Sequence, residues 1–515
     1  MPVERFFNIQ FSLQGPASAS KGPERNNFCC SRGRSIHYIV LPLFLIMIAV
    51  FSCKSPRQMG RTGIPDKLLE NPALYDAHTG IAIYDADNRE LIYSFNSDRF
   101  FIPASNTKIA TLYAGLRYLD DGIPGLQYLK INDTIFLRAT GDPTFLVHYF
   151  QDQPVFDFLR STRKPLVFIK PGWQTSALGY GWPWNFYLEH YMAERSPFPV
   201  YGNVVRWMQR DMTGLADDVQ ISYVLSNPGH RWPVEIINGR EDKLLVTRPV
   251  SGNTYTVSPG IVEGPELIVP FSTDVMIAAL ELLSDTLRTE IGIVNGDHLP
   301  APNNQHELHP DGIFHGADCC NPIREDFFTG YIEDDQDNQW KTIYSREADS
   351  LFRPMMIYSH NLFAEQILLM VSHRIFGVMD ETRAIEFLLE NDLGEMPQKA
   401  RWVDGSGLSR YNLFSPLSFV WLLEKMKDEH GWERVSRLFP TGGEGTLGDY
   451  YLGNKGNIFA KTGTLGGNAI ALSGYLVTEG GRTLIFSILV NNHNKESREP
   501  RKAVEEFLKE IISRY

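Results

Sequence analysis

The sequence predicts an α+β fold, in which helices pack against an antiparallel sheet. A hairpin pattern lies at residues 80–95, three strand-like segments follow one another between 457 and 491, and an amphipathic helix pattern ends the chain. The stretch 146–344 is strand-rich and irregular, with many Pro, Gly and Trp residues, and is expected to be an insertion of one or more domains. The core domain is therefore expected to be discontinuous, built from residues 67–145 and 345–515.

Length and composition place the chain among folded proteins with more than one domain. Its 515 residues are 43% hydrophobic and 12% aromatic, enough for more than one packed core. The net charge of −12 at pH 7 disfavours nucleic acid as a partner, because that role requires a basic surface. The five cysteines have neither the spacing nor the accompanying histidines of a zinc or redox site, so no metal is expected.

The N-terminal region has the pattern of an export signal. The apolar run Tyr38–Phe51 follows Arg32 and Arg34 and ends beside Ser52 and Cys53. The run is too short to span a membrane comfortably, but it suits the apolar region of a signal peptide. Its end resembles a loose bacterial lipobox, in which Cys53 would be lipidated and become the first residue of the mature protein. A non-cleaved membrane anchor is the alternative.

Both alternatives place the rest of the chain outside the cytoplasm, in the periplasm or its equivalent. Residues 1–53 would be the leader, and the polar stretch 54–66, which contains Pro and Gly, would be the tether. The protein would then be attached to a membrane through its N-terminus.

The first elements of the core domain are a hairpin and a helix. Ile81–Tyr84 and Leu91–Phe95 flank a turn-rich Asp-Ala-Asp-Asn sequence, as in a hairpin. A helix is expected from Ser105 towards Tyr118, because four apolar residues at helical spacing would share its buried side. These residues are Ile109, Leu112, Leu116 and Leu119.

The C-terminal elements are three strands and a helix. The strands are expected at Asn457–Thr464, Ala469–Thr478 and Arg482–Asn491, with glycine-containing turns between them. The segment Ser497–Tyr515 places five apolar residues on one stripe and is expected to be an amphipathic helix. They are Val504, Phe507, Leu508, Ile511 and Ile512.

Ser105 and Lys108 form the first candidate catalytic pair. They are three residues apart, so on a helix they lie on one face within contact range. A serine hydroxyl is a poor nucleophile until a neighbouring base takes its proton, and a lysine in a dehydrated, cationic site can lose its own proton near neutral pH. On its own this spacing is a weak signal, because it arises by chance in many long proteins.

Two companion motifs make chance improbable. Ser359-His360-Asn361 and Lys461-Thr462-Gly463 follow in that order. A serine-lysine pair followed by S-x-N and K-T-G motifs is the signature of penicillin-binding proteins and class A β-lactamases.

The sequence around the motifs resembles the D-alanyl-D-alanine carboxypeptidase/endopeptidase family of low-molecular-mass penicillin-binding proteins, which carry a large insertion between the first two motifs. The resemblance runs from about residue 75 to the end and is weakest across 150–340. The blocks that carry it are Pro103–Lys108, Gly141–Phe145, Asn361–Gln366, Asp404–Arg410 and Ala460–Leu465. It implies a penicillin-binding-protein/β-lactamase-like transpeptidase domain with an inserted strand-rich region.

The same resemblance implies a role for each motif residue. Ser105 attacks the carbonyl of the penultimate D-alanine, Lys108 is the base, and Ser359 relays a proton to the leaving nitrogen. The implied substrate-binding residues are Asn361, Lys461, Thr462, Gly463 and Thr464. The backbone N–H groups of Ser105 and Thr464 would stabilise the oxyanion.

A glycine in a strand often admits a closely approaching backbone, so Gly463 is expected to make room for the substrate. Residues 404–409 read equally as a plain turn or as the border of the active site.

The family resemblance implies peptidoglycan stem peptides as substrates, β-lactam antibiotics as covalent inhibitors and no cofactor. The chain departs from the family pattern at two positions. His360 stands where aspartate is commoner. Asn185 follows a tryptophan, and in the family the residue after this tryptophan is aspartate. The histidine at 360 could change how activity depends on pH. The uncharged Asn185 leaves open which stem-peptide side chain the protein prefers.

Two alternatives to a peptidase remain. A β-lactamase or esterase of the same fold shares the three motifs, and only the deacylation rate separates it from a peptidase, although the long insertion favours a peptidase. An inactive peptidoglycan-binding protein is disfavoured, because every reactive side chain of the motifs is retained.

Overall fold

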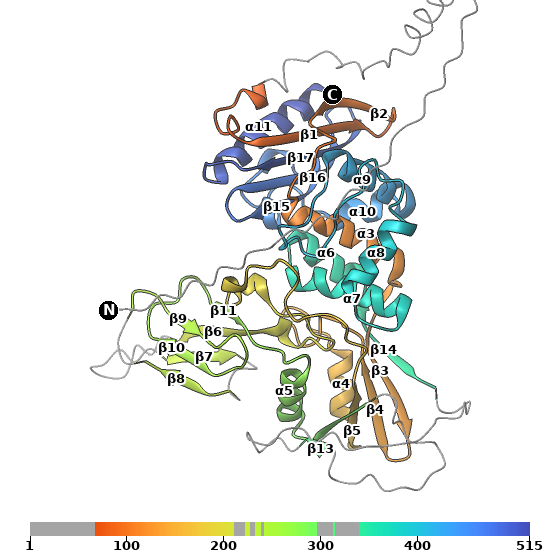
Figure 1. Cartoon of the computed structure of the whole chain (residues 1–515), viewed down its shortest axis with the longest axis vertical. Coiled ribbons are helices and arrows are strands. Elements are labelled where there is room, and N and C mark those ends of the chain that lie inside the picture. Colours follow the sequence, from red (N-terminus) through yellow and green to blue (C-terminus); the bar gives the residue numbers. More distant parts are fainter. Residues whose placement is uncertain (1–66, 211–221, 227–231, 238–240, 296–312, 315–338) are drawn as a thin grey trace, which may run out of the picture. The chain divides into compact units, whose positions relative to one another are not determined.

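The structure is a computed structural model, shown in Figure 1. It describes residues 67–515 except 211–221, 227–231, 238–240, 296–312 and 315–338. The expected leader and tether, with Cys53, lie outside the described residues. Within the described part of the chain, no helix combines the length and the apolar character needed to cross a bilayer.

A five-stranded antiparallel sheet joins the two ends of the described chain, and its strand order is β15-β16-β17-β1-β2. β1 pairs with β17, with His78 opposite Asn491, so the N-terminal hairpin adds to the three C-terminal strands. All five strands lie within a few residues of their predicted positions. The strands are β1 (His78–Asp85), β2 (Glu90–Phe95), β15 (Ile458–Leu465), β16 (Ala469–Val477) and β17 (Thr483–Asn491). The predicted α+β class is confirmed, and β15 lies at an edge of the sheet.

Helices cover both faces of this sheet (Figure 1). The amphipathic α11 (Arg498–Arg514) packs its apolar stripe, which includes Val504 and Leu508, against one face. The other face is covered by a cluster of helices with its own apolar core. The main helices of this cluster are α3 (Lys108–Tyr118), α6 (Asp349–Ile357), α7 (Asn361–Phe376), α8 (Glu381–Asn391), α9 (Pro416–His430) and α10 (Trp432–Leu438).

α3 is buried on every side, not only along the predicted stripe. Every residue from Lys108 to Leu116 is buried, because the helix packs against α7 and α9 as well as other elements of the helical cluster. Gly115 allows this close packing, since a Cβ there would lie 2.7 Å from the ring of Phe352. A helix enclosed in this way can hold a polar side chain such as that of Lys108 away from water.

A second, six-stranded sheet has the order β13-β12-β5-β4-β3-β14. Its strands are β3 (Gly122–Ile131), β4 (Thr134–Ala139), β5 (Leu166–Ile169), β12 (Ile291–Val294), β13 (Ile313–Phe314) and β14 (Lys341–Glu347). β3 and β4 precede residue 146, yet they pair with β14 and β5, so the expected boundary at 145/146 divides this sheet. The chain leaves the domain of the five-stranded sheet and enters the six-stranded sheet earlier, between α3 and β3.

In its described residues, the rest of the insertion contains two three-stranded sheets, two α-helices and short 3-10 helices. The sheets have the orders β11-β6-β7 and β8-β10-β9. Trp207 and Tyr255 from these sheets share one apolar core with Leu126 and Phe168 of the six-stranded sheet. The elements are β6 (Val204–Arg210), β7 (Ser222–Ser226), β8 (Val234–Ile236), β9 (Leu245–Thr247), β10 (Tyr255–Ser258), β11 (Leu267–Pro270), α4 (Pro154–Ser161) and α5 (Ile277–Leu287).

Candidate active site

The predicted serine-lysine pair lies at the start of α3. Ser105 belongs to a short 3-10 helix, η1 (Ala104–Thr107), which leads directly into α3, whose first residue is Lys108. The Lys108 Nζ donates a hydrogen bond of 3.0 Å to the Ser105 Oγ. The helical spacing therefore brings the two side chains of the predicted pair into contact.

Lys108 is held in a dry, polar site. Its Nζ also donates to the Asn361 Oδ1 at 2.7 Å and to the backbone oxygen of Ser406 at 2.6 Å. Burial lowers the pKa of Lys108 to about 7, although the carboxylates of Asp404 and Glu365 oppose this shift. A lysine with such a pKa is neutral in a large fraction of molecules at neutral pH, so it can accept a proton from Ser105.

The second motif faces the third across the site. The Lys461 Nζ, from β15, donates to the Ser359 Oγ at 3.0 Å. Burial lowers the pKa of Lys461 well below its ordinary value, and the positive charges of Lys108 and Arg501 add to this effect. Asn361 begins α7 and bonds Lys108 through its oxygen, while its Nδ2 donates to the backbone oxygen of Tyr191 at 2.9 Å. The three motifs therefore converge on one site.

Gly463 brings β15 against the serine. A Cβ at this position would lie 2.9 Å from the Pro103 oxygen and 3.0 Å from the Ser105 nitrogen. Gly463 therefore admits the backbone of the segment that carries Ser105, and the expected room for substrate at this glycine stays a prediction. Thr464, the next residue of the edge strand, is exposed.

The side chain of Asn106 also holds the segment around Ser105 against the sheet. In the amide orientation that satisfies both ends, it donates to the Lys461 oxygen at 2.8 Å and accepts from the Ser473 N–H at 3.1 Å. η1 is thereby tied to β15 and β16. Sequence reasoning assigned no role to Asn106.

The loop of residues 404–409 borders the site, which resolves the two readings left open by the sequence. The buried Asp404 carboxylate accepts from the N–H groups of Gly407 and Ser409 at 2.8 and 2.7 Å. It also accepts from the Trp182 Nε1, in the insertion, at 2.9 Å. This folded loop presents the Ser406 carbonyl to Lys108.

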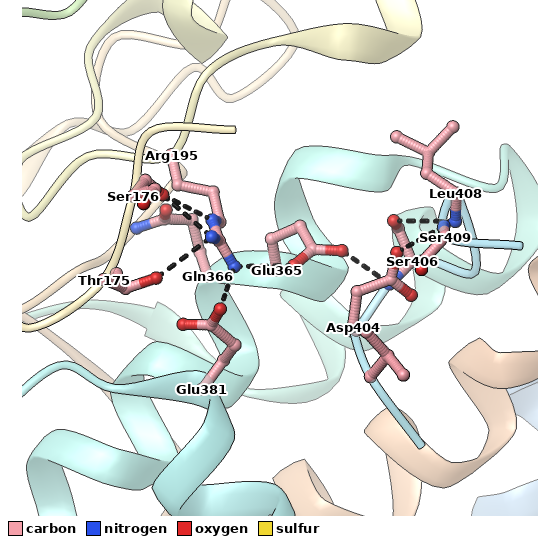
Figure 2. Close-up of polar contacts among 12 residues, drawn as sticks. Thr175, Ser176, Arg195, Glu365, Gln366, Glu381, Asp404, Ser406, Leu408 and Ser409 are labelled. Atoms are coloured by element: carbon pink, nitrogen blue, oxygen red, sulfur yellow. Dashed lines mark hydrogen bonds and ion pairs between the residues drawn. The ribbon is translucent and has the colours of Figure 1, made fainter. Parts of the chain in front are cut away.

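A buried ionic network continues from this loop into the insertion (Figure 2). The Ser406 N–H donates to the Glu365 Oε1 at 2.7 Å, and the Glu365 Oε2 lies 3.4 Å from the Arg195 Nη1. The same Arg195 nitrogen lies 2.9 Å from the Glu381 Oε1. Burial raises the pKa of Glu365 to about 7, the Asp404 carboxylate adds to this rise, and Arg195 opposes it.

Arg195 anchors the network on the side of the insertion. Its guanidinium donates to the backbone oxygen of Ser176 at 3.0 and 2.8 Å and to the Thr175 Oγ1 at 3.0 Å. Sequence reasoning missed Arg195, which belongs to none of the motifs. Glu365 stood within a recognised block but had no assigned role, although it lies four residues after Asn361 and so shares its face of α7.

Replacing Arg195 by Met should strongly destabilise the protein. The side chain is 1% exposed, and its loss leaves the carboxylates of Glu365 and Glu381 without their cation. Breaking a buried ion pair from one side typically costs about 3–5 kcal/mol. Urea unfolding followed by fluorescence measures the effect.

Arg434→Met is the matched control, because Arg434 also pairs across two elements but its side chain and that of Asp349 are 31% and 42% exposed. Its loss should cost no more than about 1 kcal/mol. Equal unfolding midpoints for the two variants would contradict the importance of the buried network.

His360 is neutral at working pH. Burial, reinforced by the charge of Lys108, lowers its pKa to about 3, and its ring stacks on Phe363 at a centroid distance of 4.0 Å. The residue that departs from the family pattern therefore adds no titration near neutral pH.

Three comparisons relate the chain to known proteins. The model of the D-Ala-D-Ala carboxypeptidase 3 (S13) family matches residues 64–297 and 333–511. A D-alanyl-D-alanine carboxypeptidase of Actinomadura sp. (strain R39) is 25% identical over 475 residues, which cover 83% of this chain and 80% of the relative. The D-alanyl-D-alanine carboxypeptidase DacB of Haemophilus influenzae is 20% identical over 506 residues, which cover 91% of this chain and 96% of the relative.

A solved structure shows the same fold. The crystal structure of penicillin binding protein 4 (dacB) from Haemophilus influenzae superposes with a TM-score of 0.65 at 18% identity, and covers 88% of this chain and 99% of that chain. The likeness includes the insertion as well as the sheet and its helices, since so much of both chains is covered.

Proposed function

Because the chain belongs to the D-Ala-D-Ala carboxypeptidase 3 (S13) family and is thus a serine-type D-alanyl-D-alanine carboxypeptidase, we propose that it hydrolyses peptidoglycan stem peptides through an acyl-enzyme on Ser105. The observation that carries this proposal is the 3.0 Å contact between the Lys108 Nζ and the Ser105 Oγ. The pKa of Lys108, lowered by burial to about 7, supports the role of this amine as the base.

Acylation begins when neutral Lys108 takes the proton of Ser105 as the Oγ attacks the carbonyl carbon of the penultimate D-alanine. The carbonyl oxygen becomes negatively charged, and the backbone N–H groups of Ser105 and Thr464 stabilise it. The contact between Gly463 and the Ser105 backbone supports this pairing, because it places the start of η1 beside the edge strand.

The leaving nitrogen needs a proton, and Ser359 relays to it the proton that Lys108 took from Ser105, so that both Ser359 and Lys108 return to their starting forms. The Ser359 hydroxyl accepts a hydrogen bond from Lys461, so its own hydrogen remains available to the nitrogen of the departing D-alanine. Lys108 then activates a water molecule that hydrolyses the acyl-enzyme. Hydrolysis of D-alanyl crosslinks is the endopeptidase form of the same reaction and belongs to the proposal.

The remaining motif residues bind the substrate. Asn361 would bond the peptide backbone of the stem while its Oδ1 keeps Lys108 in place. Lys461 and Thr462 would face the terminal carboxylate. Since this substrate lies outside the cytoplasm, we further propose that the protein is exported and anchored to a membrane by a lipid on Cys53.

Incubation with benzylpenicillin should add one penicilloyl group, located on Ser105 by peptide mapping. The protein lacking residues 1–53 is measured by intact mass over time, before and after the antibiotic. An adduct that persists for many minutes supports the peptidase. Loss of the adduct within seconds would identify a β-lactamase instead, and no adduct on folded protein would identify an inactive binding protein.

A further inference from the structure

Asp404 is linked to the proposed base, Lys108, through a single peptide group. The Gly407 N–H donates to the Asp404 Oδ1 at 2.8 Å. At the other end of the same peptide group, the Ser406 oxygen accepts from the Lys108 Nζ at 2.6 Å. A carboxylate bonded to the N–H of a peptide group polarises that group, so its carbonyl oxygen becomes a stronger acceptor. Asp404 therefore acts on Lys108 through this peptide group.

The loop that contains this peptide group is packed too closely to shift alone. Gly407 has a φ of 85°, and a Cβ there would lie 1.9 Å from the oxygen of Ala104, the residue before Ser105. A Cβ at Gly405 would lie 2.5 Å from the Ala364 oxygen of α7. A change in the loop is therefore transmitted to the nucleophile and the base.

The insertion reaches Asp404 through Trp182. The Trp182 Nε1 donates to the Asp404 Oδ2 at 2.9 Å, and both residues are buried. The indole packs with Met192 and Leu408 in one apolar cluster, and the guanidinium of Arg195 lies over its ring at 5.6 Å. A hydrogen bond to a charged group is stronger away from water, so this N–H offsets part of the charge of the carboxylate.

The charged and titratable groups that face Lys108 come from three parts of the fold. Asp404 belongs to the loop, His360 and Glu365 lie at the start of α7, and Lys461 lies on β15. The two carboxylates raise the pKa of Lys108 and so oppose the effect of burial. Trp182 bonds one of these carboxylates, so the insertion influences the charge that Lys108 experiences.

We propose that Trp182 is a positioning residue for the base: its N–H holds the Asp404 carboxylate, and through it the Ser406 carbonyl, in the arrangement that Lys108 needs for acylation. The inference rests on the proposed acyl-enzyme mechanism and goes beyond it, because it gives the insertion a part in the chemistry. Trp182 touches neither the substrate nor Ser105 in this role and acts only through Asp404.

Trp182→Phe tests the hydrogen bond, because it keeps an aromatic ring in the apolar cluster and removes the N–H donor. The charge of Asp404 is then less offset, so the pKa of Lys108 rises and less of the amine is neutral at pH 7. The rate of penicilloyl-adduct formation at pH 7 should fall roughly 3- to 10-fold, and its rise with pH should move to higher pH. Intact mass after timed quenching, measured from acidic to alkaline pH, gives the profile.

Trp207→Phe is the matched control. Trp207 also belongs to the insertion and is 1% exposed, but its Nε1 has no hydrogen-bond partner among the described residues. Its pH profile should equal that of the wild type. A merely structural role of Trp182 would lower the urea unfolding midpoint of Trp182→Phe without moving the pH at which acylation rises.

Asp404→Asn should move the rise in the opposite direction, to lower pH, because it removes the negative charge itself. Its plateau rate should also fall, since an amide cannot accept all four hydrogen bonds that the carboxylate accepts. A Trp182→Phe profile equal to that of Trp207→Phe, or shifts of both position-182 and position-404 variants in one direction, would overturn the inference and leave the peptidase proposal intact. A wild-type protein that forms no penicilloyl adduct would overturn the proposed function itself.

Discussion

Ser105→Ala should abolish D-alanine release and penicillin acylation together. The hydroxyl accepts a hydrogen bond from Lys108 and lies beside the edge strand that carries Thr464. Without it the acyl-enzyme cannot form, and the loss of turnover should be on the order of 10⁶-fold, as when a serine protease loses its nucleophile. Release of D-alanine from a pentapeptide and the intact mass after penicillin measure the two effects.

The fold should survive this substitution. Ser105 is only half-buried, and its removal leaves the Lys108 Nζ bonded to Asn361 and Ser406. Ser436→Ala is a suitable control, because that hydroxyl lies on α10 and bonds only the backbone of its own helix. D-alanine release by Ser105→Ala at the rate of this control would refute the nucleophile assignment.

The sequence contained enough information for the centre of the site, because each motif is local. Ser105 and Lys108 meet through one helical turn, and Lys461 lies on a strand-like run that a glycine turn ends. The order of the three motifs matched a known signature, and the family resemblance implied that they form one site. The sheet strands were predicted because turn residues separate their strand-like runs.

Contacts between distant segments could not be predicted in this way. The expected boundary at 145/146 divides the six-stranded sheet. It could not be placed better from the sequence, because the pairing of β4 with β5 depends on the tertiary fold and not on the sequence of either strand alone. Arg195 is a single arginine outside any motif, and its place in the buried network comes from partners far away in the sequence, Glu365 and Glu381. Lys108, by contrast, has its partner Ser105 only three residues away.

Lys108→Met should be almost as inactive as Ser105→Ala. Methionine fills a similar volume but cannot accept a proton, so Ser105 would have to attack as the neutral alcohol. Residues that act as one unit lose activity together, and the acylation rate with penicillin should fall by at least about 10⁴-fold. Ser105 itself is untouched, so any residual adduct should still map to it.

The pH dependence of acylation identifies the base. Only the neutral amine accepts a proton, and since the pKa of Lys108 is about 7, the wild-type rate should rise as the pH passes upward through 7 and then level off. The Glu365 carboxyl also has a pKa of about 7, so a rise at this pH does not by itself single out the lysine. In Glu365→Gln a negative charge near Lys108 is removed, its pKa falls, and the rise should move to lower pH. The residual rate of Lys108→Met should lack this rise altogether, whereas an unchanged rise in that variant would assign the titration, and with it the role of base, to another group.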